Sequence, residues 1–232
     1  MKKKIITLLV FLLILCGCEN KTIYQQTTNS QTQYYDNIPE EDSTRYLILV
    51  NKDNRITEED LKKYQLVNIE SYDGTILQLE KETYINFLAL QEDLKNQNTE
   101  ISIREGYRTI DDQQYIWDLY LKEKGEAYTK KYVAVPGYSE HHTGLALDLI
   151  PKSGDDFVVD PEEVGNVKYI YATIHKTLPK YGFILRYPKG KEEITGYDYE
   201  PWHLRYVGKE VAQEIYNNNL TLEEYLTNQT LT

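Results

Sequence analysis

A histidine and an aspartate near the middle of the chain have side chains and a spacing that could bind a metal ion. His141 precedes a stretch in which bulky residues alternate with small or acidic ones: Gly144, Leu145, Ala146, Leu147, Asp148 and Leu149. This alternation predicts a β-strand with one apolar face and one face of small residues that ends in a carboxylate. A buried carboxylate needs a cation or a metal ion as its partner. A turn before the strand would bring His141 to Asp148, although this spacing alone is weak evidence for a metal.

A glutamate and a histidine farther along the chain are a second candidate. Glu200 and His203 are three residues apart, a spacing that could place both on one face of a helix. Pro201 directly follows Glu200 and biases it toward extended geometry, so we predict a turn that leads into a strand. We expect Trp202 to pack in the core. Local sequence leaves open whether Glu200 is functional or an ordinary surface charge.

An arginine supplies the third candidate, in the segment Gly106-Tyr107-Arg108-Thr109, with Gln113 shortly after it. Arg108 lies where a predicted strand meets the beginning of a predicted helix. Its guanidinium group and the backbone amides at the helix N-terminus would both favour an anion there. A structural salt bridge is the alternative for this arginine.

The elements that must position these residues form an α+β pattern. Besides the strand at 144–149, strands are predicted over residues 46–50, 101–104, 183–187 and 204–207. Helices are predicted over 57–65 and 81–96, from Thr109 onward, along the apolar stripe Val167, Ile170, Ile174 and Leu178, and around Val211 and Ile215. In the helix from Thr109, Asp112 is a capping-box signal, and the expected apolar face is Ile116, Leu119 and Tyr120. We therefore predict one α+β domain over residues 45–232, which is long enough to bury a proper core.

The N-terminus has the pattern of a signal peptide. Three lysines precede an apolar run of residues 5–15, which is too short to span a bilayer. The following Leu15-Cys16-Gly17-Cys18 resembles a bacterial lipobox. The resemblance implies a signal peptide over residues 1–17 and lipidation of Cys18; an uncleaved anchor and an ordinary secretory signal are the alternatives. Cys16 would leave with the signal, so no cysteine would remain for a disulfide or for catalysis.

Residues 18–44 are rich in Asn, Gln, Thr and Tyr and have almost no aliphatic residues. Such a segment cannot bury enough apolar surface to fold, so we predict a flexible linker; a partner-binding segment is the alternative. The whole chain of 232 residues has a formal net charge of −11. This acidic balance argues against a nucleic-acid-binding protein, which needs a basic surface.

Taken together, the three candidate segments resemble the VanY-type D-alanyl-D-alanine carboxypeptidases of the LAS zinc-peptidase group. The matching motifs are G-Y-R-T-x-x-x-Q, S-E-H-x-T-G-L-A-x-D and E-P-W-H-x-R-Y-V-G, in that order. The resemblance implies a hedgehog/D-Ala-D-Ala-peptidase-like domain, in which helices flank a small central antiparallel sheet. It also implies one Zn²⁺ held by His141, Asp148 and His203, with Glu200 as catalytic base, and substrate contacts from Ser139, Arg108 and Gln113. We expect no metal role for His142, whose side chain should point away from that of His141, and a structural or exposed position for His175.

The expected activity is removal of the C-terminal D-alanine from peptidoglycan stem peptides. Arg108 is expected to stabilise the oxyanion or to hold the substrate carboxylate, two roles that the sequence does not separate. An L,D-carboxypeptidase or endopeptidase acting on the same stems is an alternative, and a non-catalytic cell-wall-binding lipoprotein is another. The lipobox implies a protein anchored by lipid on the extracytoplasmic face of a bacterial membrane, and we expect this protein to be a monomer.

Overall fold

A small antiparallel sheet lies at the centre of the chain. The computed structural model describes residues 44–153, 156–157 and 168–231; the predicted signal peptide and nearly all of the predicted linker lie outside these residues. The strand order is β3-β4-β7-β6, and the short β5 pairs with β4. The strands are β3 (Ile101–Glu105), β4 (Ala146–Ser153), β5 (Asp156–Phe157), β6 (Phe183–Leu185) and β7 (His203–Tyr206). The predicted α+β class and the antiparallel sheet are confirmed.

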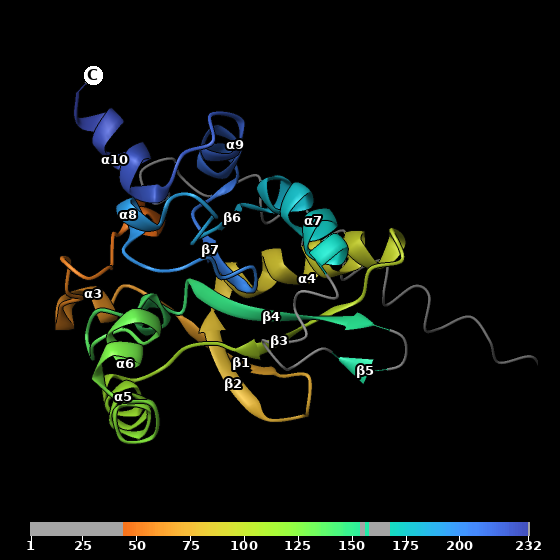
Figure 1. Cartoon of the computed structure of the whole chain (residues 1–232). Helices are drawn as coiled ribbons and strands as arrows, with labels where there is room; N and C mark the ends of the chain where they lie inside the picture. The colour runs from red at the N-terminus through yellow and green to blue at the C-terminus, as the bar shows by residue number, and fades with distance from the viewer. Residues whose placement is uncertain (1–43, 154–155, 158–167, 232) are drawn as a thin grey trace, which may run out of the picture. The chain divides into compact units, whose positions relative to one another are not determined.

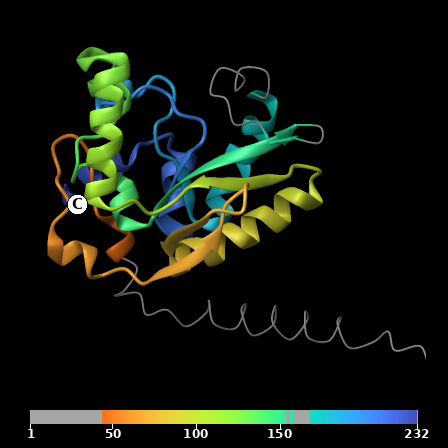
Figure 2. The ribbon, with the colours of Figure 1, turned by 90° about the horizontal axis from the view of Figure 1, so that it is seen from below.

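The two faces of the sheet have different roles. Leu147, Leu149 and Leu204 point to the face that packs against helices and belong to the main hydrophobic core. Helices α4 (Lys81–Asn96) and α7 (Lys168–Thr177) contribute Phe87 and Ile174 to the same core. Figures 1 and 2 show α4 running alongside the strands. Because side chains alternate along a strand, Asp148 and His203 point to the opposite face.

Two further helices stand where β4 begins. Helix α5 (Ile110–Lys124) starts at the predicted capping box, in which Thr109 Oγ1 accepts from Asp112 N–H. The shorter α6 (Glu126–Tyr132) packs against it, and the pair lies at one end of the sheet (Figures 1 and 2). The predicted apolar face of α5 was wrong in part, because Tyr120 is exposed and the residue that α5 buries is Gln113.

A hairpin that we did not predict hydrogen-bonds through its second strand to the backbone of Tyr107 and Gly144. Strands β1 (Leu66–Glu70) and β2 (Ile76–Glu80) pair antiparallel. Their turn contains Asp73, whose carboxylate accepts from Ser71 Oγ and Thr75 N–H. Gly74 follows with a φ of +86°. Asp-Gly between apolar alternations is a strong turn signal, so the sequence did carry this information.

The predicted strand over residues 46–50 was wrong. A 3₁₀ turn, η1 (Thr44–Leu47), occupies its beginning, and no ladder follows. The segment is nevertheless buried, with Tyr46 and Val50 in the interior. Two of its backbone carbonyls accept from a side chain, since Arg205 Nη2 donates to the carbonyls of Tyr46 and Ile48 at 2.8 and 2.7 Å. The apolar run marks burial here, and not a strand.

The other predicted helices and strands are present, but their boundaries differ. The predicted helix over 57–65 is limited to α3 (Glu58–Leu61), and the third apolar stripe forms α7 and then η4 (Leu178–Tyr181), with Val167 outside the described residues. The C-terminal region folds into α8 (Glu192–Thr195), α9 (Lys209–Asn217) and α10 (Leu222–Thr230), of which only α9 was predicted. Helices α9 and α10 close a second core with β6.

Within the part of the chain that the structure describes, no helix has the length and apolar character required to cross a membrane.

Candidate metal centre

The pairing of β4 with β7 brings two of the candidate ligands together. Asp148 and His203 are direct partners in the antiparallel register, next to the pair Leu147 and Leu204. Directly opposed residues point to the same face and lie close enough for their side chains to interact. The predicted turn leading from Glu200 into a strand is confirmed, because residues 201–202 form a turn and β7 begins at His203.

The third candidate ligand, His141, lies in the turn before β4. His141 belongs to the 3₁₀ helix η2 (Glu140–Thr143), which ends at Gly144 in the left-handed conformation. The Nδ1 atom of His141 lies 2.7 Å from the carbonyl oxygen of Gly106. This hydrogen bond orients the ring, so that Nε2 faces the sheet.

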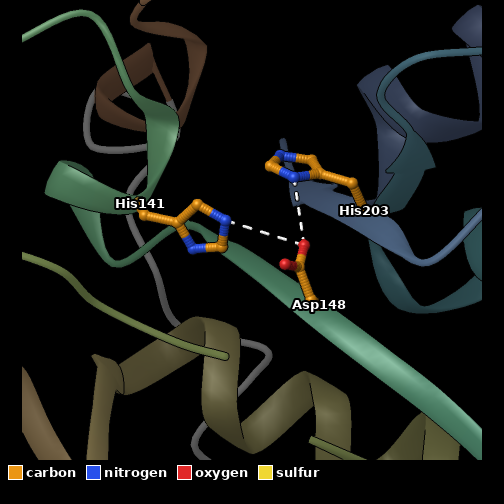
Figure 3. Close-up of side chains that lie close together, drawn as sticks. All are labelled: His141, Asp148 and His203. Carbon is orange, nitrogen blue, oxygen red and sulfur yellow. Dashed lines mark ion pairs between the residues drawn. The ribbon is translucent and has the colours of Figure 1, made fainter. Parts of the chain in front are cut away.

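The three side chains converge on one point. His141 Nε2 lies 3.6 Å from Asp148 Oδ1, and His203 Nδ1 lies 3.1 Å from the same oxygen. Figure 3 shows the two imidazole rings on either side of the carboxylate, each turning one nitrogen toward it. One ligand atom from each residue can be chosen so that all lie within 4.8 Å of one another.

An unpaired polar atom in this cluster indicates that the residues fit a metal ion. Among the described residues, Asp148 Oδ1 is buried without a hydrogen-bond partner. Such atoms are costly unless something else satisfies them. Two imidazoles and one carboxylate form a donor set typical of zinc, so Zn²⁺ suits the unsatisfied oxygen and the facing ring nitrogens.

The charges in the cluster reinforce one another. Burial would raise the pKa of Asp148, but His141 and His203 outweigh it and hold that pKa well below its ordinary value. Burial would lower the pKa of His203, but Asp148 and Glu140 raise it to about 9. Since a ligand imidazole must present a lone pair, binding of an ion has to displace a proton from His203.

Glu200 stands beside this cluster. Its Oε2 lies 3.8 Å from His203 Nδ1, the nitrogen that also faces Asp148. Burial is the main reason that the pKa of Glu200 is raised to about 7, with the charge of Asp148 adding to it and those of His203 and Arg108 opposing it. A carboxyl group with such a pKa can accept and return a proton near neutral pH. The open alternative of a surface charge is wrong.

Arg108 and Gln113 form a connected pair near Glu200. Arg108 Nη1 donates to Gln113 Oε1 at 2.7 Å, and Gln113 Nε2 donates to the carbonyl of Ala134 at 2.8 Å. Arg108 also pairs with Glu105 at 3.5 Å and keeps 16% of its side chain exposed. The arginine is therefore held in place while its guanidinium remains accessible to a ligand.

The structure also places the other residues singled out in the sequence. Ser139 is buried at the N-terminal end of η2, two residues before His141. His142 uses both ring nitrogens, since Nδ1 lies 2.7 Å from the carbonyl of Arg108 and Nε2 accepts from Gly137 N–H. His175 Nε2 lies 2.8 Å from the carbonyl of Pro201. Trp202 packs against the main core as expected.

Sequence reasoning missed a buried charge network behind His203. Glu140 is 1% exposed, and its Oε1 accepts from Arg186 and Arg205, both of which are fully buried. Burial would raise the pKa of Glu140, but the two arginines hold it well below the ordinary value. The alternation in β7 places Arg205 on the face of His203, and this was the available signal. Nothing local pointed to Arg186.

Comparison with known proteins agrees with this geometry. The family model described as VanY, D-alanyl-D-alanine carboxypeptidase, matches residues 76–209. The bifunctional D-Ala-D-Ala dipeptidase and D-Ala-D-Ala carboxypeptidase VanXYC of Enterococcus gallinarum is 46% identical over 127 residues, which are 54% of this chain and 66% of that protein. Three of the curated relatives are matched over about half to two thirds of their own length, between 47% and 66%.

Two solved structures share the fold. A variant of the vancomycin resistance D,D-pentapeptidase VanY in complex with Zn(II) is 34% identical, with a TM-score of 0.65 over 78% of this chain and 99% of that chain. The LD-carboxypeptidase LdcB is 37% identical, with a TM-score of 0.66 over 81% of this chain and 88% of that chain. The family model covers the three candidate ligands, Glu200 and Arg108. The chain therefore belongs to the VanY family of D-alanyl-D-alanine carboxypeptidases.

Proposed function

We propose that this chain is a zinc-dependent D,D-carboxypeptidase that removes the C-terminal D-alanine from peptidoglycan stem peptides or their precursors. The observation that carries the proposal is the position of Glu200, 3.8 Å from the nitrogen of His203 that also faces Asp148. A largely buried carboxyl group, 15% exposed, beside a three-residue ligand set is the arrangement of a hydrolytic zinc site. The family to which the chain belongs supports the choice of D-alanine as the leaving group.

In this proposal, His141, Asp148 and His203 hold the ion through the atoms that already face one another, Nε2, Oδ1 and Nδ1. Three protein ligands leave a fourth position for water or substrate. When bound, zinc would polarise the peptide carbonyl and make a water molecule easier to deprotonate.

Glu200 moves the proton. Its carboxylate takes a proton from water as the water oxygen bonds to the carbonyl carbon of the last peptide bond. The C–N bond then breaks, and Glu200 returns the proton to the leaving amine of D-alanine. The products are a stem peptide shortened by one residue and free D-alanine.

Arg108 supplies a positive charge for one of two negative groups. These are the terminal carboxylate of the substrate and the oxygen that becomes negative during water attack. The hydrogen bond to Gln113 fixes the guanidinium for either role, and Ser139 is proposed to donate a hydrogen bond to the substrate. With Arg108→Lys, a rise in KM indicates carboxylate binding, whereas a fall in kcat indicates oxyanion stabilisation.

The decisive test is release of D-alanine by the full-length protein. The protein is loaded with zinc, incubated with a stem pentapeptide ending in D-Ala-D-Ala, and the products are identified by mass spectrometry with and without chelator. We expect free D-alanine and a tetrapeptide only when zinc is present. Intact zinc content without any D-alanine would reject the proposed activity.

An L,D-carboxypeptidase is the second candidate, because the LD-carboxypeptidase LdcB shares the fold at 37% identity. The same assay with a stem tetrapeptide separates the two: faster release of D-alanine from the tetrapeptide than from the pentapeptide would favour L,D specificity. Internal fragments would instead indicate an endopeptidase.

We also propose that the protein is a monomer anchored by lipid on the extracytoplasmic face of a bacterial membrane. The support for the lipid anchor is the sequence Leu15-Cys16-Gly17-Cys18 after an apolar run, and a substrate that lies outside the membrane. Cys18→Ala should move the protein out of the membrane fraction; retention there would reject the lipid anchor. Sedimentation of the detergent-solubilised protein measures its oligomeric state.

A further inference from the structure

Glu140 is a buried carboxylate that the proposed reaction does not use. It immediately precedes His141 in η2. Its Oε1 accepts from Arg186 Nε at 2.7 Å and from Arg205 Nη1 at 2.6 Å. Its Oε2 has no hydrogen-bond partner among the described residues and lies 3.6 Å from His203 Nε2. One oxygen is thus fully occupied, and the other faces a candidate metal ligand.

The two arginines fix the direction in which this second oxygen points. Arg186 donates from Nη1 and Nη2 to the carboxylate of Glu223 at 2.9 and 2.5 Å. Arg205 donates from Nη2 to the backbone carbonyls of Tyr46 and Ile48. Rotation of the Glu140 carboxylate would break charge-assisted hydrogen bonds, which are the strong ones. Two buried arginines balance two glutamates, so Glu140 is held as an anion.

The two candidate ligand histidines are arranged in the same way. In His141, Nε2 faces Asp148 and Nδ1 faces the carbonyl of Gly106. In His203, Nδ1 faces Asp148 and Nε2 faces Glu140. A neutral imidazole that binds a metal needs its lone pair on one nitrogen and its proton on the other, and an acceptor behind the ring selects this tautomer.

We propose that Glu140 is a positioning residue, which accepts the Nε2–H of His203 and thereby keeps Nδ1 as the lone-pair donor toward the ion. At 3.6 Å the contact is longer than a hydrogen bond. The proposal therefore requires the ring and the carboxylate to approach by about half an ångström in the zinc-loaded protein. It rests on the zinc site of the proposed function but not on its substrate.

The test substitutes Glu140→Gln in the full-length protein. Glutamine has one acceptor oxygen and one donor amide group. Because Arg186 and Arg205 only donate hydrogen bonds, the glutamine oxygen must face them. The amide N–H group then faces His203 Nε2 and favours the tautomer with its proton on Nδ1. We expect the zinc dissociation constant, measured by competition with a chromogenic chelator, to rise by roughly 10- to 100-fold. The absorption spectrum of the Co²⁺-loaded variant should change as well.

Glu223→Gln is the matched control. It removes a carboxylate from the same network and from the same Arg186, but Glu223 does not face His203 in the contacts described. Its zinc affinity and Co²⁺ spectrum should equal those of the unmodified protein. Unchanged affinity in Glu140→Gln, or an equal loss in both variants, would overturn the proposal.

A measurement on the unmodified protein decides the question even if Glu140→Gln does not fold. Nitrogen NMR of the zinc-loaded, ¹⁵N-histidine-labelled protein reports which nitrogen of His203 carries a proton. We expect a proton on Nε2; a proton on Nδ1 refutes the role of Glu140. Tight zinc binding without D-alanine release would reject only the proposed activity, whereas absence of zinc binding would reject both.

Discussion

Replacing Gly144 with alanine tests how the turn before β4 delivers His141 to the site. Gly144 has a φ of +70°, a left-handed conformation that residues with a side chain rarely adopt. An added Cβ would lie 2.8 Å from the backbone nitrogen of Glu80 and 2.7 Å from Leu66 Cδ2. The Glu80 N–H also donates to the Gly144 carbonyl at 3.0 Å. The two segments therefore cannot separate without losing a hydrogen bond.

The expected loss has two parts. A non-glycine residue held in the left-handed region costs roughly 1–3 kcal/mol. The Leu66 methyl group can move aside, but the backbone of Glu80 cannot, and overpacking of this kind costs roughly 1–3 kcal/mol more. We expect Gly144→Ala to lower the free energy of unfolding by roughly 2–6 kcal/mol. Because His141 lies just before this turn, zinc affinity should fall too.

Gly190→Ala is the matched control for this prediction. Gly190 has a φ of +84°, and no atom lies within 4 Å of an added Cβ. This variant therefore carries the backbone strain without the collision. The free energy of unfolding of both variants is measured by urea denaturation of the metal-free, full-length protein. An equal loss of stability in the two would refute the argument from close approach.

Glu200→Gln should retain zinc and lose roughly 10²- to 10⁴-fold in kcat, because it removes the proton acceptor; metal analysis beside the D-alanine assay checks this, and loss of zinc would contradict it. His203→Ala should lose the metal itself, since it removes one of three ligands. Its zinc content is compared with that of Glu200→Gln, and equal zinc contents would contradict the ligand role of His203. Phe87→Ala should lower the free energy of unfolding by roughly 3–5 kcal/mol, since Phe87 is buried in the main core. The exposed Leu88 on the same helix is its control, and equal urea midpoints for the two alanine variants would argue against the core described.

Local patterns were sufficient for the strands that carry the site. The alternation around Leu147 and Asp148 predicted which face is apolar, and Pro201 correctly argued against a helix through Glu200 and His203. These features depend on steric rules that act over a few residues. These strands and the turn before His203 could therefore be predicted from short segments, whereas the ligand set was implied only by the family resemblance.

Tertiary contacts explain what the sequence did not reveal. The run from Tyr46 to Val50 is apolar because it is buried, but its carbonyls bond to Arg205 and not to another strand. Glu140 meets Arg186 and Arg205 only after the sheet has formed. The alternation in β7 indicates the face of Arg205, but no sequence spacing indicates its contact with Glu140 or the position of Arg186. Long-range hydrogen bonds override local propensity in both cases.

The register of β4 and β7 has a consequence for the order of folding. Asp148 and His203 are direct partners, although a long stretch of chain separates them. Bringing the two strands together costs loop-closure entropy before their contacts can stabilise the pair. A slip by one residue would turn His203 to the apolar face. The complete ligand set therefore exists only after these two strands have paired in register. The rate at which a refolding chain binds zinc would consequently report the rate at which β4 and β7 pair.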